Sequence, residues 1–453
     1  MPSRRETALP GLARRPRVRV ERIGRDVRVS GNGPLNGEVR VPGSKSLTQR
    51  MLICAALADG TSTLHGALLA DDTRIMAEGL GRLGAAIEID EACDEIEICG
   101  CGGHWRADRA ELDVGAAGTA MRFLTAAACL GNGLHRIDGS ERMRQRPIAA
   151  LVDALHQLGA EIGYERDSGY PPLTIMARGL TGGEVVFDSP PSSQYVSAIL
   201  MVAPYAANDV MIRIDGSLPS RPYIDLTLDA MRTMGVEVLE SDGRRFVIPS
   251  SQRYIGGVHE IEPDASSASY FFAAAAVTGG RMRVAGLTRR SRQGDAGFVD
   301  VLEQMGCSVD EGGDYLEVRG PRSGKLAGVS VDLNAMPDTV QTLAVAALFA
   351  EGPTEIRNVA NLRVKETDRL AALAAELARL DAKVDLYDDG LKIYPPMRTA
   401  SAEIRTYDDH RMAMSFSIAG LAGAPVLIKD ADCVSKSFPE FFSVLAGIPS
   451  GGR

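Results

Sequence analysis

The sequence predicts an α/β protein of two domains, each built from three copies of one α/β unit. The prediction rests on three observations: a length of 453 residues, a helical pattern that recurs at a nearly constant spacing, and short alternating apolar segments between the helices. A chain of this length exceeds what one hydrophobic core usually serves. Its 45% hydrophobic and 24% charged residues are ordinary for a globular protein.

One helical pattern ends in small residues and a glycine-type turn six times. These ends lie 71 to 76 residues apart, at Gly60, Gly133, Asp209, Gly280, Gly352 and Ala424. A second helix keeps the same spacing, ending for example at Leu83-Gly84 and Leu158-Gly159. Alternating apolar residues follow it, as in Ile87-Glu88-Ile89, which is typical of a half-buried strand. The repeated unit is therefore helix, strand, loop, helix and strands, and six units in two domains give three per domain.

The N-terminal segment differs in composition from the rest. Its first 25 residues hold eight arginines and little apolar periodicity, so residues 1–26 are predicted to be a solvated, disordered tail. A targeting role is disfavoured, because transit peptides are rich in Ser and poor in acidic residues while this segment has one Ser and two Glu. No apolar run has the length of a membrane span or the form of a signal peptide. We therefore expect a cytoplasmic protein without membrane partners.

Cysteine usage favours reduced thiols, because seven cysteines are an odd number spread over a long chain. Cys93, Cys99, Cys101 and His104 could in principle bind zinc. Their spacing is irregular, however, and the apolar alternation before Cys99 is typical of a strand entering a glycine turn. We therefore expect no metal.

A formal net charge of −9 argues against nucleic acid as a partner, so an anionic ligand needs a local basic cluster. Small hydroxyl or acidic residues precede most of the repeated helices and are predicted to cap them; for Asp264 capping is the favoured role. Capping does not explain cations at helix starts, where the helix dipole disfavours them. Such cations recur at Lys45, Arg50, Arg122, Arg144, Arg146, Arg221, Lys365, Arg369, Arg411 and Lys436. Their recurrence in several repeats indicates a highly anionic ligand.

From about Val27 to its C-terminus the chain resembles the 3-phosphoshikimate 1-carboxyvinyltransferase (EPSP synthase) family. The matching segments, in the family's order, are Pro42–Arg50, Gly118–Arg122, Arg146-Pro147-Ile148, Ser192–Tyr195, Ser220–Asp225, Gln293–Asp295, Pro337-Asp338, Asn361–Arg369, Asp409–Met412 and Lys436–Pro439. The resemblance implies the enolpyruvyl transferase fold, in which each domain is a pseudo-threefold arrangement of βαβαββ units. Domain I would comprise residues 27–43 and 263–453, domain II residues 44–262, and the active site would lie in the cleft between them.

The resemblance also implies the reaction. The carboxyvinyl group of phosphoenolpyruvate is transferred to the 5-hydroxyl of shikimate 3-phosphate, with release of phosphate, in the shikimate pathway to chorismate and the aromatic amino acids. No cofactor is implied, the partners are the two small substrates, and we expect a monomer. Glyphosate binds the phosphoenolpyruvate site in this family.

Site residues carry over position by position. The phosphoenolpyruvate side would be Lys45, Gly118, Arg146, Gln194, Arg369, Arg411 and Lys436. The shikimate 3-phosphate side would be Lys45, Ser46, Arg50, Ser192, Ser193, Gln194, Ser220, Tyr223, Asp338, Asn361 and Lys365. The catalytic residues would be Lys45, Asp338, Glu366 and His410.

The reaction removes a proton from the 5-hydroxyl and adds one to C3 of phosphoenolpyruvate. We expect Asp338 to act as base toward the hydroxyl, Glu366 as acid and later base at the methylene, and Lys45 on the leaving phosphate. Whether Asp338 or Lys45 takes the hydroxyl proton stays open, because coupled groups can exchange that role. His410 is either an auxiliary acid or a structural residue.

Two other functions are alternatives to this one. The sister enzymes that act on UDP-N-acetylglucosamine carry a reactive cysteine in the loop corresponding to residues 142–147, and here that loop has none. A non-catalytic paralogue is suggested by Ala116, where the family usually has asparagine, and by Phe123, where many members have proline. These two departures leave glyphosate sensitivity open.

Overall fold

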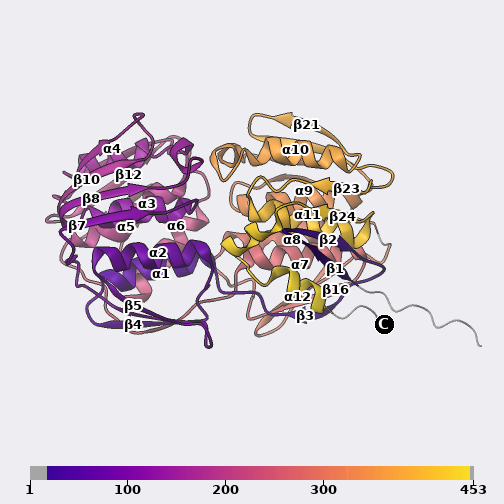
Figure 1. The fold of residues 1–453 in the computed structure, drawn as a ribbon, viewed down its shortest axis with the longest axis horizontal. Helices are drawn as coiled ribbons and strands as arrows, with labels where there is room; N and C mark the ends of the chain where they lie inside the picture. Colours follow the sequence, from indigo (N-terminus) through magenta and orange to yellow (C-terminus); the bar gives the residue numbers. More distant parts are fainter. Residues whose placement is uncertain (1–17, 324, 449–453) are drawn as a thin grey trace, which may run out of the picture.

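The computed structural model describes residues 18–323 and 325–448 and consists of two lobes that lie side by side (Figure 1). Each lobe has its own hydrophobic core. One core is formed by residues between Met51 and Ile261, and we call the surrounding structure the middle lobe. The other is formed by residues from Val27 to Val41 and from Ala265 to Ile448, and we call it the terminal lobe because the first and last described segments belong to it.

The middle lobe consists of six helices and three four-stranded sheets. The helices are α1 (Lys45–Leu57), α2 (Asp71–Leu83), α3 (Gly118–Ala128), α4 (Ala149–Gln157), α5 (Ser193–Val202) and α6 (Pro222–Thr233). The strands are β4 (Thr61–His65), β5 (Ala86–Asp90), β6 (Glu95–Cys99), β7 (Arg109–Asp113), β8 (Asn132–Asp138), β9 (Glu161–Tyr164), β10 (Leu173–Arg178), β11 (Gly183–Asp188), β12 (Val210–Asp215), β13 (Leu239–Ser241), β14 (Arg245–Ile248) and β15 (Val258–Glu260).

The described part of the terminal lobe has the same inventory. Its helices are α7 (Ala265–Thr278), α8 (Phe298–Gln304), α9 (Val340–Ala346), α10 (Arg369–Arg379), α11 (His410–Ala422) and α12 (Phe441–Gly447). Its strands are β1 (Arg19–Ile23), β2 (Asp26–Ser30), β3 (Asn36–Val39), β16 (Arg281–Ala285), β17 (Ser308–Glu311), β18 (Tyr315–Arg319), β19 (Ser330–Asp332), β20 (Thr354–Arg357), β21 (Lys383–Tyr387), β22 (Gly390–Tyr394), β23 (Ala402–Ile404) and β24 (Val426–Ile428).

All six sheets share one pattern, which confirms the predicted α/β fold of repeated units. Each sheet has a parallel pair at one edge and two further strands paired antiparallel; the order β7-β8-β10-β9 is an example. The parallel pairs are β15/β4, β7/β8, β11/β12, β3/β16, β19/β20 and β23/β24. A parallel pair needs a crossover, and in each complete unit the first helix provides it.

Two sheets exchange their first strands where the chain crosses between the lobes. Strand β3 precedes α1 in sequence but pairs with β16 of the terminal lobe, and β15 precedes α7 but pairs with β4 of the middle lobe. The two crossing segments run side by side: Ser44 N donates to Glu262 O (2.8 Å), and Asp264 N donates to Pro42 O (2.9 Å). The lobes are thus joined by one double-stranded connection.

The sixth sheet is completed by the N-terminal hairpin, which corrects one prediction. Strand β24 pairs with β2, and β2 pairs with β1, which begins at Arg19. The prediction of a disordered tail is therefore wrong for residues 19–26, while residues 1–17 lie outside the described residues. Two arginines of this stretch form ion pairs: Arg22 and Arg25 pair with Asp432 beside β24.

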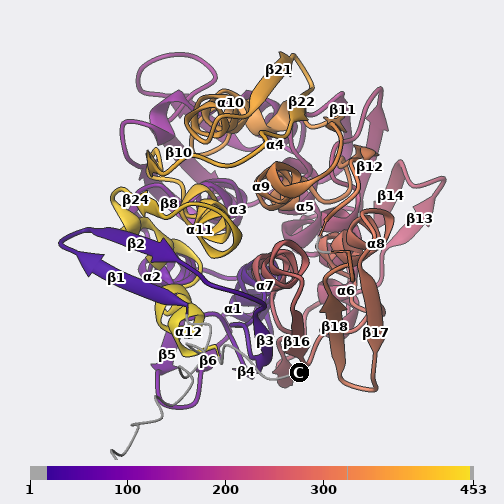
Figure 2. The same cartoon turned by 90° about the vertical axis from the view of Figure 1, so that its right-hand side faces the viewer.

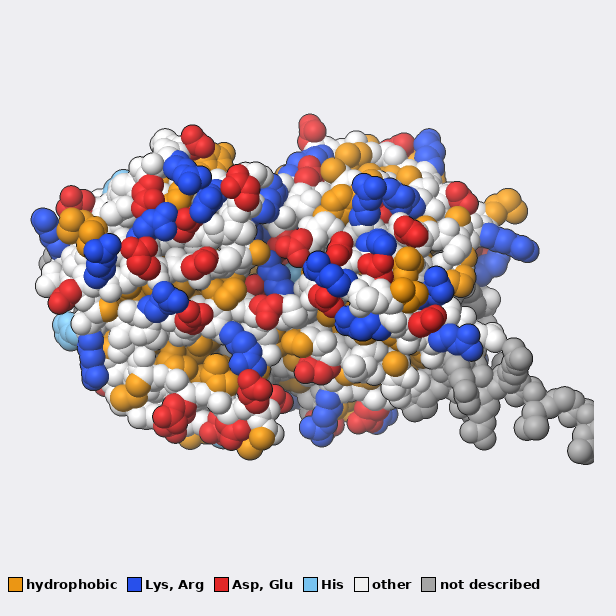
Figure 3. Space-filling view, in the orientation of Figure 1, with side chains coloured by type: hydrophobic (Ala, Val, Ile, Leu, Met, Phe, Trp, Pro, Cys, Tyr) orange, Lys and Arg blue, Asp and Glu red, His pale blue; other side chains and the backbone are white. Residues whose placement is uncertain are grey.

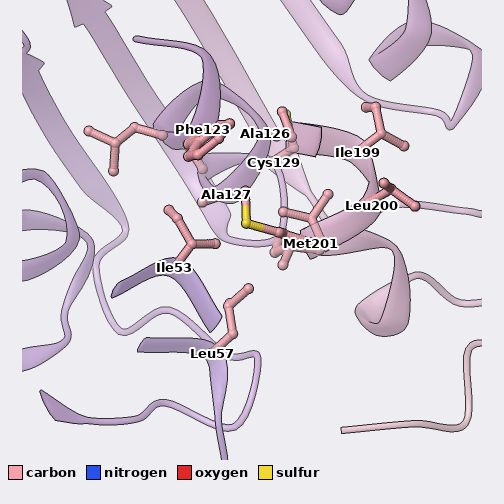
Figure 4. Packing of buried hydrophobic residues seen from close by; sticks show 14 of the residues in the cluster. Ile53, Leu57, Phe123, Ala126, Ala127, Cys129, Ile199, Leu200 and Met201 are labelled. Carbon is pink, nitrogen blue, oxygen red and sulfur yellow. The ribbon is translucent and has the colours of Figure 1, made fainter. Parts of the chain in front are cut away.

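The core of each lobe is a group of three helices surrounded by the sheets. In the terminal lobe these are α7, α9 and α11, which lie together at the centre of Figure 2. Helix α7 is apolar and buried on nearly all sides, as expected for a helix enclosed by other elements. In the middle lobe α1, α3 and α5 meet through side chains such as Ile53, Phe123 and Met201 (Figure 4).

The fold places two of the cysteines, Cys129 and Cys99, in different surroundings. Cys129 at the end of α3 is buried among these helices, and burial raises the pKa of its thiol to about 12, so it is not a reactive thiolate (Figure 4). Cys99 ends strand β6, as its apolar alternation predicted. In residues 18–323 and 325–448, no group of His, Cys, Asp or Glu side chains is arranged to hold a metal ion.

Five described helices begin with a side-chain cap; four of these caps lie in the loops where capping is predicted, and Asp368 is an additional one. Ser44, Ser192, Asp264, Asp368 and Asp409 each accept a hydrogen bond from a backbone N–H in the first turn of the helix that follows. Within the described part of the chain, no helix combines the length and apolar character needed to cross a bilayer. Acidic and basic side chains are interspersed over the face of both lobes shown in Figure 3.

Candidate active site

A cavity lies between the lobes where several helices begin. Helices α1, α3, α5, α10 and α11 each contribute a residue of their first turn to it, so the positive ends of five helix dipoles lie at this region. Its lining residues are Lys45, Ser46, Arg50, Asp72, Gly118, Thr119, Arg146, Ser192, Ser193, Gln194, Ser220, Tyr223, Asp338, Asn361, Lys365, Glu366, Arg369 and Arg411. Six of these side chains are cationic and three are carboxylates, a local charge of +3 in a chain of charge −9.

Sixteen of the eighteen residues predicted for the site line this cavity. The other two, Lys436 and His410, lie behind its wall. The Lys436 Nζ atom is 3.2 Å from Glu366 Oε1 and donates to the backbone carbonyl of Ala116 (2.9 Å). Arg144 and Arg221, two cations counted in the predicted cluster, turn away and pair with Asp138 and Asp225 on the outside of the middle lobe.

Asp338 is the acceptor at the centre of the terminal-lobe side. It receives hydrogen bonds from Arg411 NH2 (2.7 Å), Arg369 NH1 (3.1 Å) and the Tyr223 hydroxyl (3.2 Å). Burial alone would raise the pKa of this carboxyl, but Arg411, Lys365 and the other nearby cations hold it below its usual range. Asp338 is therefore ionised and can accept a proton from a nearby hydroxyl.

Arg369 is fixed by three carboxylates although it is almost completely buried. Its Nε donates to Asp409 (2.7 Å), and its two terminal nitrogens reach Asp338 (3.1 Å) and Glu366 (2.9 Å). Burial disfavours the charged guanidinium, but these carboxylates outweigh it and raise its pKa. A buried arginine held in this way keeps both its charge and its orientation.

Glu366 lies between Arg369 and Lys436. Burial would raise the pKa of its carboxyl, but Lys436, Arg369 and Arg146 hold it well below its usual range. In the ligand-free site Glu366 is therefore a carboxylate and a base. The acid role predicted for it requires an arriving anion that neutralises these cations and so favours the protonated form.

The middle-lobe side presents arginines without acidic partners. Arg146 is buried, and among the described residues no side chain or carbonyl forms a hydrogen bond or ion pair with its guanidinium. It packs against Gly118, where an added Cβ would lie 2.4 Å from Arg146 NH2. Behind it Arg122 donates to the carbonyls of Gly118 (3.0 Å) and Pro147 (2.8 Å). Burial, with the neighbouring charge of Arg146, lowers the pKa of Arg122 to about 10.

Two further cations of α1 have different surroundings. The Lys45 Nζ atom reaches the cavity and pairs with Asp72 Oδ2 at 3.1 Å. Arg50 uses its guanidinium within the lobe, donating to Thr227 Oγ1 (2.7 Å), the Ser46 carbonyl (2.8 Å) and the Tyr223 carbonyl (3.0 Å). Arg50 therefore orders Ser46 and Tyr223 at the cavity wall.

Hydroxyl and amide groups complete the wall. Asn361 donates to Ser220 Oγ across the lobes (3.4 Å), and Gln194 donates to Thr119 Oγ1 (3.0 Å). Lys365 has no carboxylate within ion-pair distance among the residues described, and burial lowers its pKa. These groups leave donors available for phosphate and carboxylate oxygens.

His410 is fully buried at the start of α11. Neither ring nitrogen has a hydrogen-bond partner among the described residues, and Nδ1 is 3.8 Å from Asp409. Burial, together with the nearby Lys45 and Arg411, holds the pKa of the imidazole well below its usual value. A neutral, enclosed imidazole favours the structural alternative over a proton donor.

Sequence reasoning missed Asp72 and Thr119. Asp72 lies in the first turn of α2, where an acidic residue is explained by the helix dipole alone. Thr119 lies inside the segment Gly118–Arg122 that carried the resemblance. The pairing of Asp72 with Lys45 depends on the contact between α1 and α2, which no local pattern indicates.

Three comparisons with known proteins identify the family and the fold. The family model "EPSP synthase (3-phosphoshikimate 1-carboxyvinyltransferase)" matches residues 29–445. A 3-phosphoshikimate 1-carboxyvinyltransferase of Serratia proteamaculans is 49% identical over 416 residues, 91% of this chain and 96% of that protein. One of Nostoc is 47% identical over 412 residues, with the same coverage.

Two solved structures have the same fold as this chain. An EPSP synthase from Acinetobacter baumannii has a TM-score of 0.78 and 28% identity, covering 93% of this chain and 97% of that one. The enolpyruvyl transferase NikO from Streptomyces tendae has a TM-score of 0.76 over 94% of this chain and 98% of its own; at 20% identity it shows the fold alone.

The fold is therefore that of the two-lobed enolpyruvyl transferases, with a cation-rich cavity between the lobes. Within this class, the chain belongs to the EPSP synthase (3-phosphoshikimate 1-carboxyvinyltransferase) family.

Proposed function

We propose that this chain transfers the carboxyvinyl group of phosphoenolpyruvate to the 5-hydroxyl of shikimate 3-phosphate and releases phosphate, a step of the shikimate pathway. The observation that carries the proposal is the cavity between the lobes, which six cations and three carboxylates line and where several helices begin. Two phosphates and two carboxylates must leave water together for this reaction, and matched cations with backbone donors make that tolerable.

The two substrates divide the cavity. Phosphoenolpyruvate fits the side where Arg146, Gly118 and Lys436 meet Arg369 and Arg411, because Arg146 lacks a protein counter-anion there. Shikimate 3-phosphate fits the side lined by Ser192, Ser193, Ser220, Asn361 and Lys365, where hydroxyl and amide donors surround one ammonium.

The proton transfers follow from the charges. Asp338 is ionised and accepts the 5-hydroxyl proton as the oxygen attacks C2. Glu366 begins as a base and becomes a proton donor to C3 only when phosphoenolpyruvate neutralises Arg146 and Lys436; it takes the methylene proton back when phosphate leaves. Lys45, paired with Asp72, stabilises the departing phosphate.

The lobes are proposed to be the two domains predicted from sequence, residues 27–43 with 263–453 and residues 44–262, which close on shikimate 3-phosphate. Their double connection at residues 42–44 and 262–264 suits a hinge. We further propose a cytoplasmic monomer that glyphosate inhibits in competition with phosphoenolpyruvate.

A phosphate-release assay tests the reaction. Purified protein with both substrates should release one phosphate per enolpyruvyl product, identified by mass spectrometry, and omission of either substrate should abolish release. UDP-N-acetylglucosamine as acceptor should give none. If the protein is inert and Ala116→Asn makes it active, the natural sequence is a non-catalytic paralogue.

A further inference from the structure

Arg142 of the middle lobe binds the loop of the terminal lobe that carries Lys365 and Glu366. Its Nε donates to the Glu366 carbonyl and its NH2 to the Lys365 carbonyl, both at 3.1 Å. Its third contact, from NH1 to Gln145 (3.4 Å), lies within its own loop. One planar guanidinium therefore binds two consecutive carbonyls across the cleft.

The loop that Arg142 binds has no regular structure of its own. The 3₁₀ turn before it ends at Val364 and α10 begins at Arg369, so residues 365–368 belong to no helix or strand. Lys365 and Glu366 both line the cavity, and their side chains are directed by the peptide between them. Fixing both carbonyls fixes that peptide.

Glu366 is thus held from both lobes. Its carboxylate pairs with Arg369 and Lys436 of the terminal lobe, while its backbone is held by the middle lobe through Arg142. Separation of the lobes would break the two Arg142 bonds but leave the ion pairs of Arg369 and Lys436 intact. The position of the Glu366 backbone therefore depends on closure.

We propose that Arg142 is a positioning residue that couples closure of the lobes to the placement of Lys365 and Glu366. A guanidinium suits this role because its fork reaches two acceptors at once, which an ammonium cannot do with the same geometry. The inference rests on the proposed function, since it assigns Arg142 a part in that reaction.

Arg144 in the same loop offers a matched control. It is also a partly exposed arginine, but both of its hydrogen bonds go to Asp138 in its own lobe (2.9 Å each). Arg144→Ala removes a similar side chain without touching the opposite lobe. We expect its kcat and KM to stay within twofold of the wild type.

Steady-state kinetics tests the coupling. Arg142→Ala should lower kcat/KM by about 10–100-fold, as for hydrogen bonds from a charged donor, with most of the loss in kcat, and Arg142→Lys should be intermediate. Because Arg142 acts through the loop, adding Arg142→Ala to Glu366→Ala should lower kcat/KM further by less than about threefold. Circular dichroism establishes that each variant is folded. A loss below twofold in folded Arg142→Ala, or full additivity with Glu366→Ala, overturns the proposal.

A measurement independent of turnover tests closure. Small-angle scattering measures the radius of gyration of each protein with saturating shikimate 3-phosphate. The radius of the wild type should be smaller than that of Arg142→Ala. The radius of Arg144→Ala should equal that of the wild type. Equal radii for Arg142→Ala and the wild type overturn the closure coupling. A wild type inert with both substrates would instead defeat the proposed function, so the two failures are distinguishable.

Discussion

The buried arginines of the two lobes differ in how their charge is balanced. In the terminal lobe, Arg369 and Arg411 form ion pairs with Asp338 and Asp409, and their pKa values are raised although burial opposes this. In the middle lobe, no described carboxylate pairs with Arg50 or Arg122, and burial lowers their pKa values to about 10.

The difference separates two kinds of cation in one cavity. A paired arginine is rigid before the ligand arrives and costs little to keep there, while an unpaired buried arginine retains a charge that only a ligand can compensate. The terminal lobe therefore supplies fixed geometry, and the middle lobe, through Arg146, supplies the attraction for an anion.

The largest expected effect tests the paired side. Asp409→Ala removes the buried partner of Arg369 and the cap of α11, and should lower the free energy of unfolding by about 3–5 kcal/mol. Arg146→Met, which removes an unpaired buried cation, should change it by less than about 1 kcal/mol or raise it. Urea denaturation measures both. Similar losses in the two variants would mean that the lobes do not differ in this way.

Catalysis should depend on residues of both lobes. Lys45→Ala of the middle lobe and Glu366→Ala of the terminal lobe should each lower kcat at least ~100-fold in a folded protein. Stopped assays of phosphate release measure this. Near-normal turnover in either variant removes that residue from the mechanism.

The buried carboxyl of Asp295 should make the stability of the protein fall as the pH rises. Asp295 is buried, and burial together with the charge of Asp338 raises its pKa to about 7. Its protonated form is favoured by folding, so its contribution to stability is present below about pH 4 and is lost as pH rises toward 7. Asp295→Asn should therefore raise the free energy of unfolding at pH 8 by about 1–4 kcal/mol relative to wild type. Denaturation of both proteins at pH 5 and pH 8 measures this change. If Asp295→Asn changes the free energy of unfolding equally at both pH values, titration of Asp295 does not explain it.

The smallest effect concerns the position of Arg146. In Gly118→Ala the new Cβ would lie 2.4 Å from Arg146 NH2 and displace the guanidinium. We expect kcat/KM for phosphoenolpyruvate to fall about tenfold, the inhibition constant of glyphosate to rise by more, and the KM for shikimate 3-phosphate to stay constant. Gly81→Ala, whose Cβ meets nothing within 4 Å, is the control. Equal changes for both substrates would contradict a local effect on Arg146.

Local sequence patterns predict the repeat, the helix starts and most residues that line the candidate site. Apolar periodicity and caps such as Ser44 and Asp409 act within a few residues, so they can be read locally. The motif matches then located sixteen of the cavity residues, because each motif is a short continuous stretch whose side chains lie near one another.

How the units close and which charges are balanced depend on contacts between segments that are distant in the sequence. The prediction of a disordered tail is wrong from Arg19 onward. The reason is that β24 pairs with a strand of the N-terminal hairpin, which lies about 400 residues away in the sequence. Arg144 and Arg369 look alike as cations near helix starts, yet one faces solvent and the other is buried among three carboxylates. Strand pairing and charge compensation depend on groups brought together only by folding, so local sequence does not specify them.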